Sequence, residues 1–167
     1  EGISYTDQEW IFMPLTTIRT FMYVPGVLYI YTLGREGQTM SNTFSAMHFK
    51  DNLICTSHIL DSYATLTDEV PIIKKMLIEK LFKRIRYIYK FYLLKCQQPD
   101  YTILTELDKK LEITCPEVYE RSNHIIMSSP LFLYKYIKHW RSNPDGKLLQ
   151  LMIKLYRCKK SFKKIKQ

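Results

Sequence analysis

The chain has 167 residues, of which 46% are hydrophobic and 25% charged, and its formal net charge is +9. This length fits one domain with its own core, and no Pro-, Gln- or Ser-rich stretch indicates disorder. Lysine or arginine interrupts the longest apolar stretches, so no segment reaches the roughly 20 apolar residues that a membrane-spanning helix needs. We expect a single domain over residues 1–167, with a β-containing part at 1–50 and a helical part at 51–167.

The N-terminal part is expected to contain β-structure. Residues 16–33 are rich in Thr, Val, Ile, Tyr and Phe, and Pro25 and Gly26 stand in the middle. This composition with a central turn signal predicts a β-hairpin. Both alternating faces carry apolar groups, so helices should cover the hairpin. A third short strand is expected at 42–49, and residues 53–65 form either a helix or a strand, of which the helix is favoured.

Residues 70–95 carry the clearest helical pattern. Thr67 or Asp68 can cap the helix, and Pro71 suits its first turn, where the missing N–H costs nothing. At 100° per residue one broad face is apolar, and it consists of Leu77, Ile78, Leu81, Phe82, Ile85, Ile88, Tyr89 and Tyr92. The opposite face is cationic and carries Lys75, Lys83, Arg86 and Lys90. The pattern predicts a core helix with a basic outer side.

Four further helices are expected, at residues 101–113, 116–126, 130–141 and from 147 onward, with a turn at 143–146 between the last two. The last helix should bury an apolar stripe made of Leu148, Leu151, Met152, Leu155, Cys158 and Phe162. The final two helices should form an antiparallel hairpin. The expected fold class is therefore α+β but predominantly α, a bundle of four to five helices with a small N-terminal β-hairpin or sheet.

Residues 101–126 resemble the helix-turn-helix unit of transcription regulators, whose second helix enters the major groove of DNA. The resemblance rests on two short helices, carrying Leu104, Leu107 and Leu111 and then Val118, Tyr119 and Ile125. The sequence departs from that unit at Asp108, where a small residue is usual, and at Glu112, where glycine is usual. The segment is also net acidic, which phosphates repel. Two amphipathic helices packed in the bundle are the favoured interpretation.

The charge is concentrated in two blocks of the chain. Residues 70–95 hold eight basic residues and one acidic residue, and residues 130–167 hold eleven and one. Crowded like charges favour a polyanionic partner, so we expect a non-catalytic module that binds nucleic acid or an acidic protein surface. The candidate binding residues are Lys75, Lys83, Arg86, Lys90, Lys135, Lys138, Arg141, Lys154, Arg157, Lys160 and Lys164. A solvated face that only keeps the protein in solution is the alternative.

Two further interpretations use other residues. In the first, the chain is an interaction or scaffold subunit of a larger complex, and the apolar side chains of Trp10, Phe12, Tyr29 and Tyr31 form the contact while the lysines only solubilise. In the second, the basic sequence at 159–166 contacts anionic lipid headgroups or serves as an address signal.

No catalytic, metal or cofactor motif stands out. The five glycines form no phosphate-binding loop, and the only close pair of potential metal ligands is Cys55 with His58, without a second pair. The interpretation leans away from an enzyme, and no cofactor is expected. The four cysteines are widely scattered, which favours a reducing compartment, the nucleus or the cytoplasm.

Overall fold

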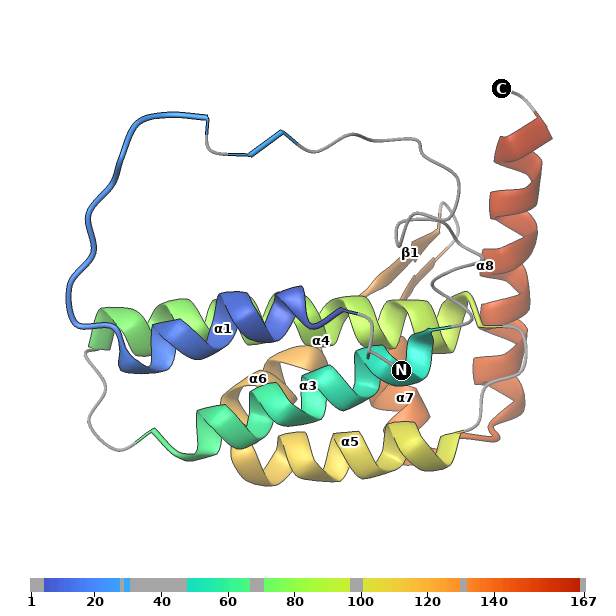
Figure 1. Ribbon diagram of the computed structural model, residues 1–167. Coiled ribbons are helices and arrows are strands. Elements are labelled where there is room, and N and C mark those ends of the chain that lie inside the picture. The colour runs from blue at the N-terminus through green and yellow to red at the C-terminus, as the bar shows by residue number, and fades with distance from the viewer. Residues whose placement is uncertain are drawn as a thin grey trace.

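Helices dominate the computed structural model of this chain, which describes residues 5–27, 29–30, 48–66, 71–96, 101–129 and 132–165, except for the side chains of 128, 129, 132 and 159–165. The described helices are α1 (Asp7–Thr17), α3 (Phe49–Ala64), α4 (Pro71–Leu94), α5 (Tyr101–Thr114), α6 (Pro116–Ser122), α7 (Tyr136–Ser142) and α8 (Lys147–Ile165). Two short strands, β1 (Met127–Ser129) and β2 (Phe132–Tyr134), lie between α6 and α7. Figure 1 shows their arrangement.

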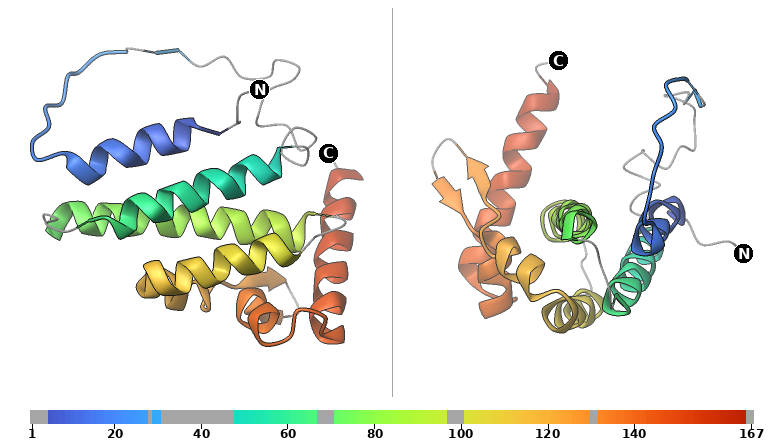
Figure 2. Two further views of the ribbon diagram at one scale, coloured as in Figure 1. Left: turned by 60° about the horizontal axis from the view of Figure 1, so that its bottom comes forward. Right: turned by 90° about the vertical axis from the view of Figure 1, so that its left-hand side faces the viewer.

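Helix α4 lies at the centre of this arrangement. Viewed along its axis in the right panel of Figure 2, α1, α3 and α5 lie around one part of α4, and α6, α7, the strands and α8 around another. The side of α4 between α1 and α8 stays uncovered by other helices. Helix α4 confirms the predicted helix at 70–95. The predicted capping residues Thr67 and Asp68 lie outside the described residues.

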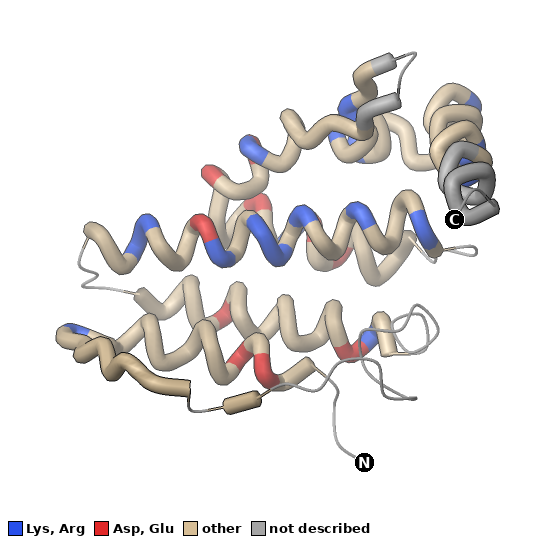
Figure 3. Tube along the Cα trace, turned by 90° about the horizontal axis from the view of Figure 1, so that it is seen from above, with Lys and Arg blue, Asp and Glu red and all other residues tan. Residues whose placement is uncertain are grey.

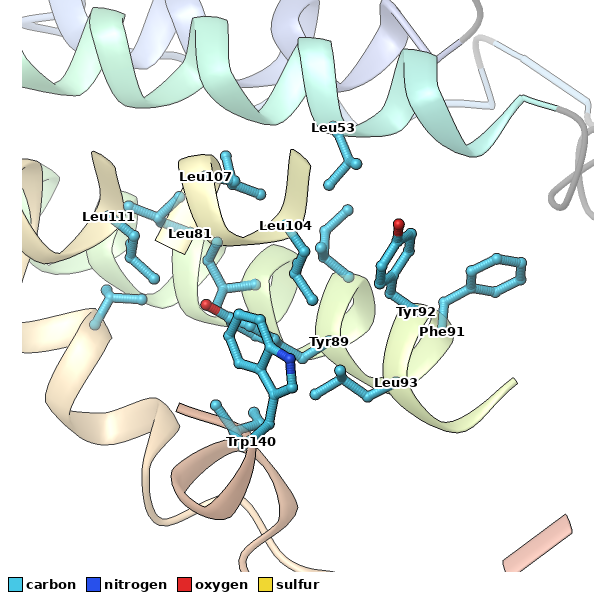
Figure 4. Packing of buried hydrophobic residues seen from close by; sticks show 14 of the residues in the cluster. Leu53, Leu81, Tyr89, Phe91, Tyr92, Leu93, Leu104, Leu107, Leu111 and Trp140 are labelled. Carbon is cyan, nitrogen blue, oxygen red and sulfur yellow. The ribbon is translucent and has the colours of Figure 1, made fainter. Parts of the chain in front are cut away.

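The inner face of α4 supplies much of the hydrophobic core. All eight residues of its predicted apolar face are buried except Phe82, which is half-buried. Figure 4 shows α5 side chains reaching this face from one side and Trp140 of α7 from another. The Trp140 ring lies 5.9 Å from that of Tyr89 and 6.2 Å from that of Tyr101, measured between centroids. Such aromatic contacts add to the stabilisation that apolar burial provides.

The expected α+β class with an N-terminal β-hairpin or sheet is wrong, because the described residues before α3 contain the helix α1 and no strand, and the described part of the chain is predominantly helical. Residues 16 and 17 of the predicted hairpin belong to α1, and residues 18–27 form no strand. Residues 28 and 31–33 of that prediction lie outside the description, as do 42–47 of the predicted third strand. Phe49 begins α3 instead, which confirms the favoured helix at 53–65. Strand-forming residues need a neighbouring strand to pair with, and no described segment offers one to residues 18–27.

The chain after α5 differs from the prediction in its details. Helix α6 ends at Ser122 rather than at 126. The expected helix at 130–141 begins only at Tyr136, because the preceding residues form the antiparallel pair β1 and β2, in which Met127 pairs with Tyr134. Three residues in each strand are the only β-structure among the described residues. The turn before α8 is confirmed by the hydrogen bond from the Gly146 amide to the Asn143 carbonyl, at 3.1 Å.

Helix α8 confirms the predicted final helix but buries a different stripe. Leu149 and Ile153 are buried, whereas Leu148, Leu151 and Leu155 are about half exposed, at 52%, 51% and 45%. The sequence places apolar residues on more than one side of this helix, so periodicity alone could not select the buried side. The packing of α8 against the C-terminal end of α4 determines which side of α8 is buried, and Figure 1 shows α8 crossing that end of α4.

Candidate functional site

The outer side of α4 carries a row of cations that we call the α4 face, namely Lys75, Lys80, Lys83, Arg86 and Lys90. All five side chains are exposed. At 1.5 Å of rise per residue the row extends over about 22 Å, which matches six to seven base-pair steps of duplex DNA. Within the described part of the chain, none of the five makes an ion pair. The predicted cationic face of this helix is therefore exposed and makes no direct ion pair within the described residues.

Lys80 was not among the predicted residues, although a signal for it exists. It precedes Lys83 by three positions, and residues three apart lie on the same side of a helix. Exposed apolar side chains are interleaved with the cations, since Ile72, Met76 and Tyr87 are 63%, 44% and 40% exposed. The α4 face thus combines amines with apolar and aromatic surface.

The acidic residues of the neighbouring helices do not compensate this face. Figure 3 shows Lys and Arg following one another along α4, while Asp and Glu on α1 and α3 lie to one side. Glu79 is the only acidic residue of α4, and its carboxylate is held by Arg121 at 2.8 Å. The hydrogen bond from Arg121 is the main cause that lowers the pKa of Glu79, and the charges of Lys83 and Lys75 lower it further. The direct ion pair of Glu79 is nevertheless with Arg121 and not with a lysine of the face.

Arg84 shows the contrasting case on the same helix. Its guanidinium turns inward and donates hydrogen bonds to the Thr56 hydroxyl at 3.0 Å and to the Asn52 carbonyl at 3.2 Å. Burial lowers the pKa of Arg84. This arginine fastens α4 to α3 and takes no part in the α4 face.

Arg141 was predicted as a binding residue, but the structure places it in the core. Its side chain is 9% exposed and pairs with Asp108 of α5 at 2.6 Å. It also donates to the Tyr119 carbonyl at 3.1 Å and to Asn123 Oδ1 at 2.7 Å, and its guanidinium lies 3.6 Å from the centre of the Tyr119 ring. Because its donors are engaged within the fold, Arg141 stabilises the packing of the helices and does not form part of a binding surface.

Arg157, also predicted, is engaged in a similar way. It donates hydrogen bonds to the carbonyls of Leu94, at 3.1 Å, and of Cys96. Carbonyls at the end of a helix lack intrahelical partners, so Arg157 of α8 satisfies the C-terminal end of α4. This contact explains part of the docking of α8.

The cations around α7 separate into two groups. Lys138 is exposed, whereas Tyr136, Ile137 and Trp140 of the same helix are buried. Lys138 therefore leaves α7 on the side away from the core and does not join the α4 face. Lys135, which precedes α7, lies with its Nζ 3.5 Å from Nδ1 of His124, and His124 lines a pocket together with Arg86.

The remaining predicted cations lie on α8. Lys154 is exposed. Lys160 and Lys164 belong to the described helix, but their side chains lie outside the description. The C-terminal turns of α8 rise beyond α4 on its uncovered side, in Figure 1 and in the right panel of Figure 2. The structure thus brings the basic end of α8 to the same side of the molecule as the α4 face.

A second surface is apolar and lies near the N-terminus. Among the residues that the structure describes, ten of the twenty exposed large hydrophobic side chains fall within residues 10–30, and Figure 1 shows the chain after α1 leaving the helices as an extended segment. Of the predicted contact residues, Trp10 and Tyr29 are 80% and 75% exposed, while Phe12 is buried in the core. Tyr31 lies outside the described residues.

The one predicted pair of potential metal ligands, Cys55 and His58, meets Glu9 of α1. His58 Nδ1 lies 2.8 Å from Glu9 Oε1, and burial together with Glu9 raises the pKa of the Cys55 thiol to about 11. A thiol with a raised pKa is a poor nucleophile. The described residues contain no group of three or more His, Cys, Asp or Glu side chains placed to hold a metal ion.

The segment resembling a helix-turn-helix unit does form two helices, α5 and α6, joined at Cys115. Asp108 is buried and bound to Arg141, so the unusual residue at that position has a structural cause. Val118 is fully buried in the core, whereas Glu117 and Glu120 of α6 are exposed. The outer side of α6 therefore offers carboxylates, which repel phosphates.

None of the described helices is both long enough and apolar enough to cross a membrane. Comparisons with protein-family models, with curated proteins and with solved structures find no match to this chain. Its function has to be inferred from its own residues.

Proposed function

We propose that this protein is a non-catalytic module that binds the backbone of a nucleic acid along the α4 face. One observation carries the proposal: five exposed cations share one side of α4, and none of them has an ion-pair partner within the described residues. Such cations neutralise phosphates and release the counterions condensed on the nucleic acid. No base-specific contact is part of the proposal.

The uncovered position of the face supports a long, rod-like ligand. The five side chains of the face are exposed, and the face is straight because it follows one helix. Tyr87, which is 40% exposed, adds a ring on which an unpaired base could stack. These features favour a nucleic-acid strand over a compact acidic protein.

Binding to duplex and single-stranded oligonucleotides over 50–200 mM salt tests the proposal. If five phosphates are neutralised, the logarithm of the duplex affinity falls with log salt at a slope of about −4.5, a loss of about 500-fold over that range. Because nonspecific dissociation constants lie at about 10⁻⁴ to 10⁻⁶ M in physiological salt, fluorescence anisotropy with labelled oligonucleotides covers the range.

A pair of charge-matched double variants locates the surface. Lys83→Ala with Lys90→Ala should reduce the slope by about 2. The control, Lys109→Ala with Lys138→Ala, removes the same charge from exposed positions on α5 and α7 and should leave the slope nearly unchanged. Alanine preserves helix propensity in all four cases. Equal losses in both variants, or no binding by the wild type at 50 mM salt, would overturn the proposal.

A second function, docking of another protein subunit, is favoured by the apolar segment at residues 10–30. Exposed apolar surface of this extent normally marks an interaction site, and Phe21 and Tyr23 are 85% and 82% exposed. A second copy of this chain is the partner that can be tested directly. Sedimentation velocity should show association that Phe21→Ser with Tyr23→Ser abolishes without changing oligonucleotide binding. A wild type that remains monomeric at 100 μM, a concentration on the order of weak dimer constants, would exclude this partner.

A further inference from the structure

A shallow pocket opens where α4 meets the end of α6. It has a volume of about 230 Å³ and is lined by Phe82, Arg86, Arg121, His124, Ile125 and Ile126. These residues come from the middle of α4 and from the chain between α6 and β1. Lys135, which follows β2, approaches the same place, with its Nζ 3.5 Å from His124 Nδ1. Three side chains that can carry positive charge therefore line the pocket, and a fourth, Lys135, lies beside His124.

The charges at the pocket are only partly balanced. Arg121 is neutralised, since its guanidinium lies 2.8 Å from Glu79 and 3.9 Å from Glu117, and its carbon lies 4.2 Å from the centre of the Phe82 ring. Arg86 and Lys135 contact no carboxylate within the described residues. Two formal positive charges beside a histidine thus remain uncompensated, and an anion in the pocket would relieve their repulsion.

Arg86 lies between the pocket and the start of α7. It lines the pocket, and its positive charge lowers the pKa of Tyr136, the first residue of α7, which burial raises. A planar guanidinium can present two parallel donors to a phosphate. Lys135 and the His124 ring can then approach the same group from the other wall.

The size of the pocket suits a phosphate with part of the molecule that carries it. The apolar wall formed by Ile125 and Ile126, of which Ile126 is 46% exposed, can contact the carbon atoms of a sugar. Arg86 belongs both to the pocket and to the α4 face, so a strand lying along that face passes the mouth of the pocket.

We propose that this pocket binds a phosphate group through Arg86, His124 and Lys135, and that a bound nucleic-acid strand inserts one of its phosphates there. That the phosphate belongs to a nucleic acid rests on the proposed function, whereas the presence of an anion site does not. The pocket then fixes the position of a strand that the lysines of the α4 face otherwise hold without a defined register.

Titration of the full chain with inorganic phosphate tests the site without any nucleic acid. The imidazole signals of His124, assigned by their loss in His124→Gln, should shift in NMR spectra and saturate with phosphate. Arg86→Gln should abolish that saturation, and Lys109→Ala, an exposed lysine on α5, should leave it intact. Shifts that never saturate, or that are the same in Arg86→Gln, overturn the site.

Oligonucleotide binding then tests the role of the site. At 200 mM salt Arg86→Gln should cost about tenfold in affinity, as expected for a hydrogen-bonded charged contact, whereas Lys83→Ala should cost about fourfold through counterion release alone. Saturable phosphate binding without any oligonucleotide binding would leave the anion site standing and remove the proposed function. Oligonucleotide binding that is sensitive to Lys83 but indifferent to Arg86 would leave the proposed function standing and remove the role of the pocket in strand binding.

Discussion

Replacing the largely buried Arg141 with methionine should destabilise the protein more than removing any single charge from its surface. Arg141 of α7 contacts three further helices. It pairs with Asp108 of α5, and its guanidinium lies 5.5 Å from the centre of the Tyr89 ring of α4. It also donates hydrogen bonds to Tyr119 of α6 and to Asn123 just beyond that helix. The hydroxyl of Tyr89 also donates to Asp108. Methionine keeps much of the side-chain length but none of the donors.

The magnitude follows from burial. Asp108 and Arg141 are 11% and 9% exposed in their side chains, so the variant leaves a carboxylate buried with the Tyr89 hydroxyl as its remaining side-chain donor. Removing one partner of a buried pair costs about 3–5 kcal/mol, against a total stability of about 5–15 kcal/mol for a domain. With a urea m-value of about 2 kcal/mol/M, the midpoint should fall by about 1.5–2.5 M.

Urea unfolding followed by far-UV circular dichroism measures this loss, and two variants calibrate it. Arg121→Met breaks a pair whose side chains are 35% and 46% exposed and should lower the urea midpoint much less, because exposed ion pairs contribute little to stability. Asp108→Leu with Arg141→Met removes both charges and should cost less than Arg141→Met alone, because no buried carboxylate is left unpaired. If Arg141→Met costs no more than Arg121→Met, the buried network does not stabilise the fold as argued.

Three further outcomes are expected. Burial raises the pKa of Tyr136, so the folded state keeps a proton that the unfolded state loses near pH 10. The contribution of Tyr136 to stability is therefore constant below that pH and falls by about 1.4 kcal/mol per pH unit above it. Because burial also raises the pKa of Tyr89, Tyr136→Phe should reduce the slope of stability against pH by about that amount, without removing it, in urea midpoints measured up to pH 11. Exposed Cys158 should react with a thiol reagent in the folded protein, whereas Cys55, whose pKa burial raises to about 11, should react only after unfolding. Equal reaction rates of the two thiols in the folded protein would contradict the burial of Cys55. Arg157→Ala removes donors from carbonyls at the end of α4 and should lower the calorimetric Tm by about 5 °C while leaving the salt slope of oligonucleotide binding unchanged.

The parts that sequence could predict share one property, a single dominant periodicity. Helix α4 has apolar residues on one side and cations on the other, and the structure buries and exposes them accordingly. Helix α8 has apolar residues on more than one side, and the stripe with Leu148 and Leu151 turned out to be half exposed. Where two faces can be buried, only the neighbouring elements decide between them.

The failure at the N-terminus has a different cause. The β-branched and aromatic residues after α1 predicted a hairpin, but this preference describes side chains that pack in a sheet and does not create one. Helix α1 itself was missed, and Pro14 inside it breaks the usual pattern of a helix. Both errors arise because local composition was used for a segment whose structure depends on its surroundings.

Arg141 illustrates why site residues were harder to predict than helices. It repeats every three residues with Lys135 and Lys138, so the local pattern assigned it to the same surface. Its partner, Asp108, lies 33 positions earlier, beyond any local pattern. A signal did exist on α5, where Asp108 falls between Leu104, Leu107 and Leu111 on the buried side, and a buried carboxylate requires a cation.

The uncompensated charge on α4 works against folding, which is the strongest reason to attribute it to binding. Lys80, Lys83, Arg86 and Lys90 follow one another at spacings of three or four residues, and each such like-charge pair costs a helix about 0.2–0.5 kcal/mol. The same helix uses its other charged residues differently, since Glu79 holds Arg121 and Arg84 donates hydrogen bonds to α3. A surface that carries this cost and forms no ion pair among the described residues resembles other binding sites, where function is maintained at the expense of stability.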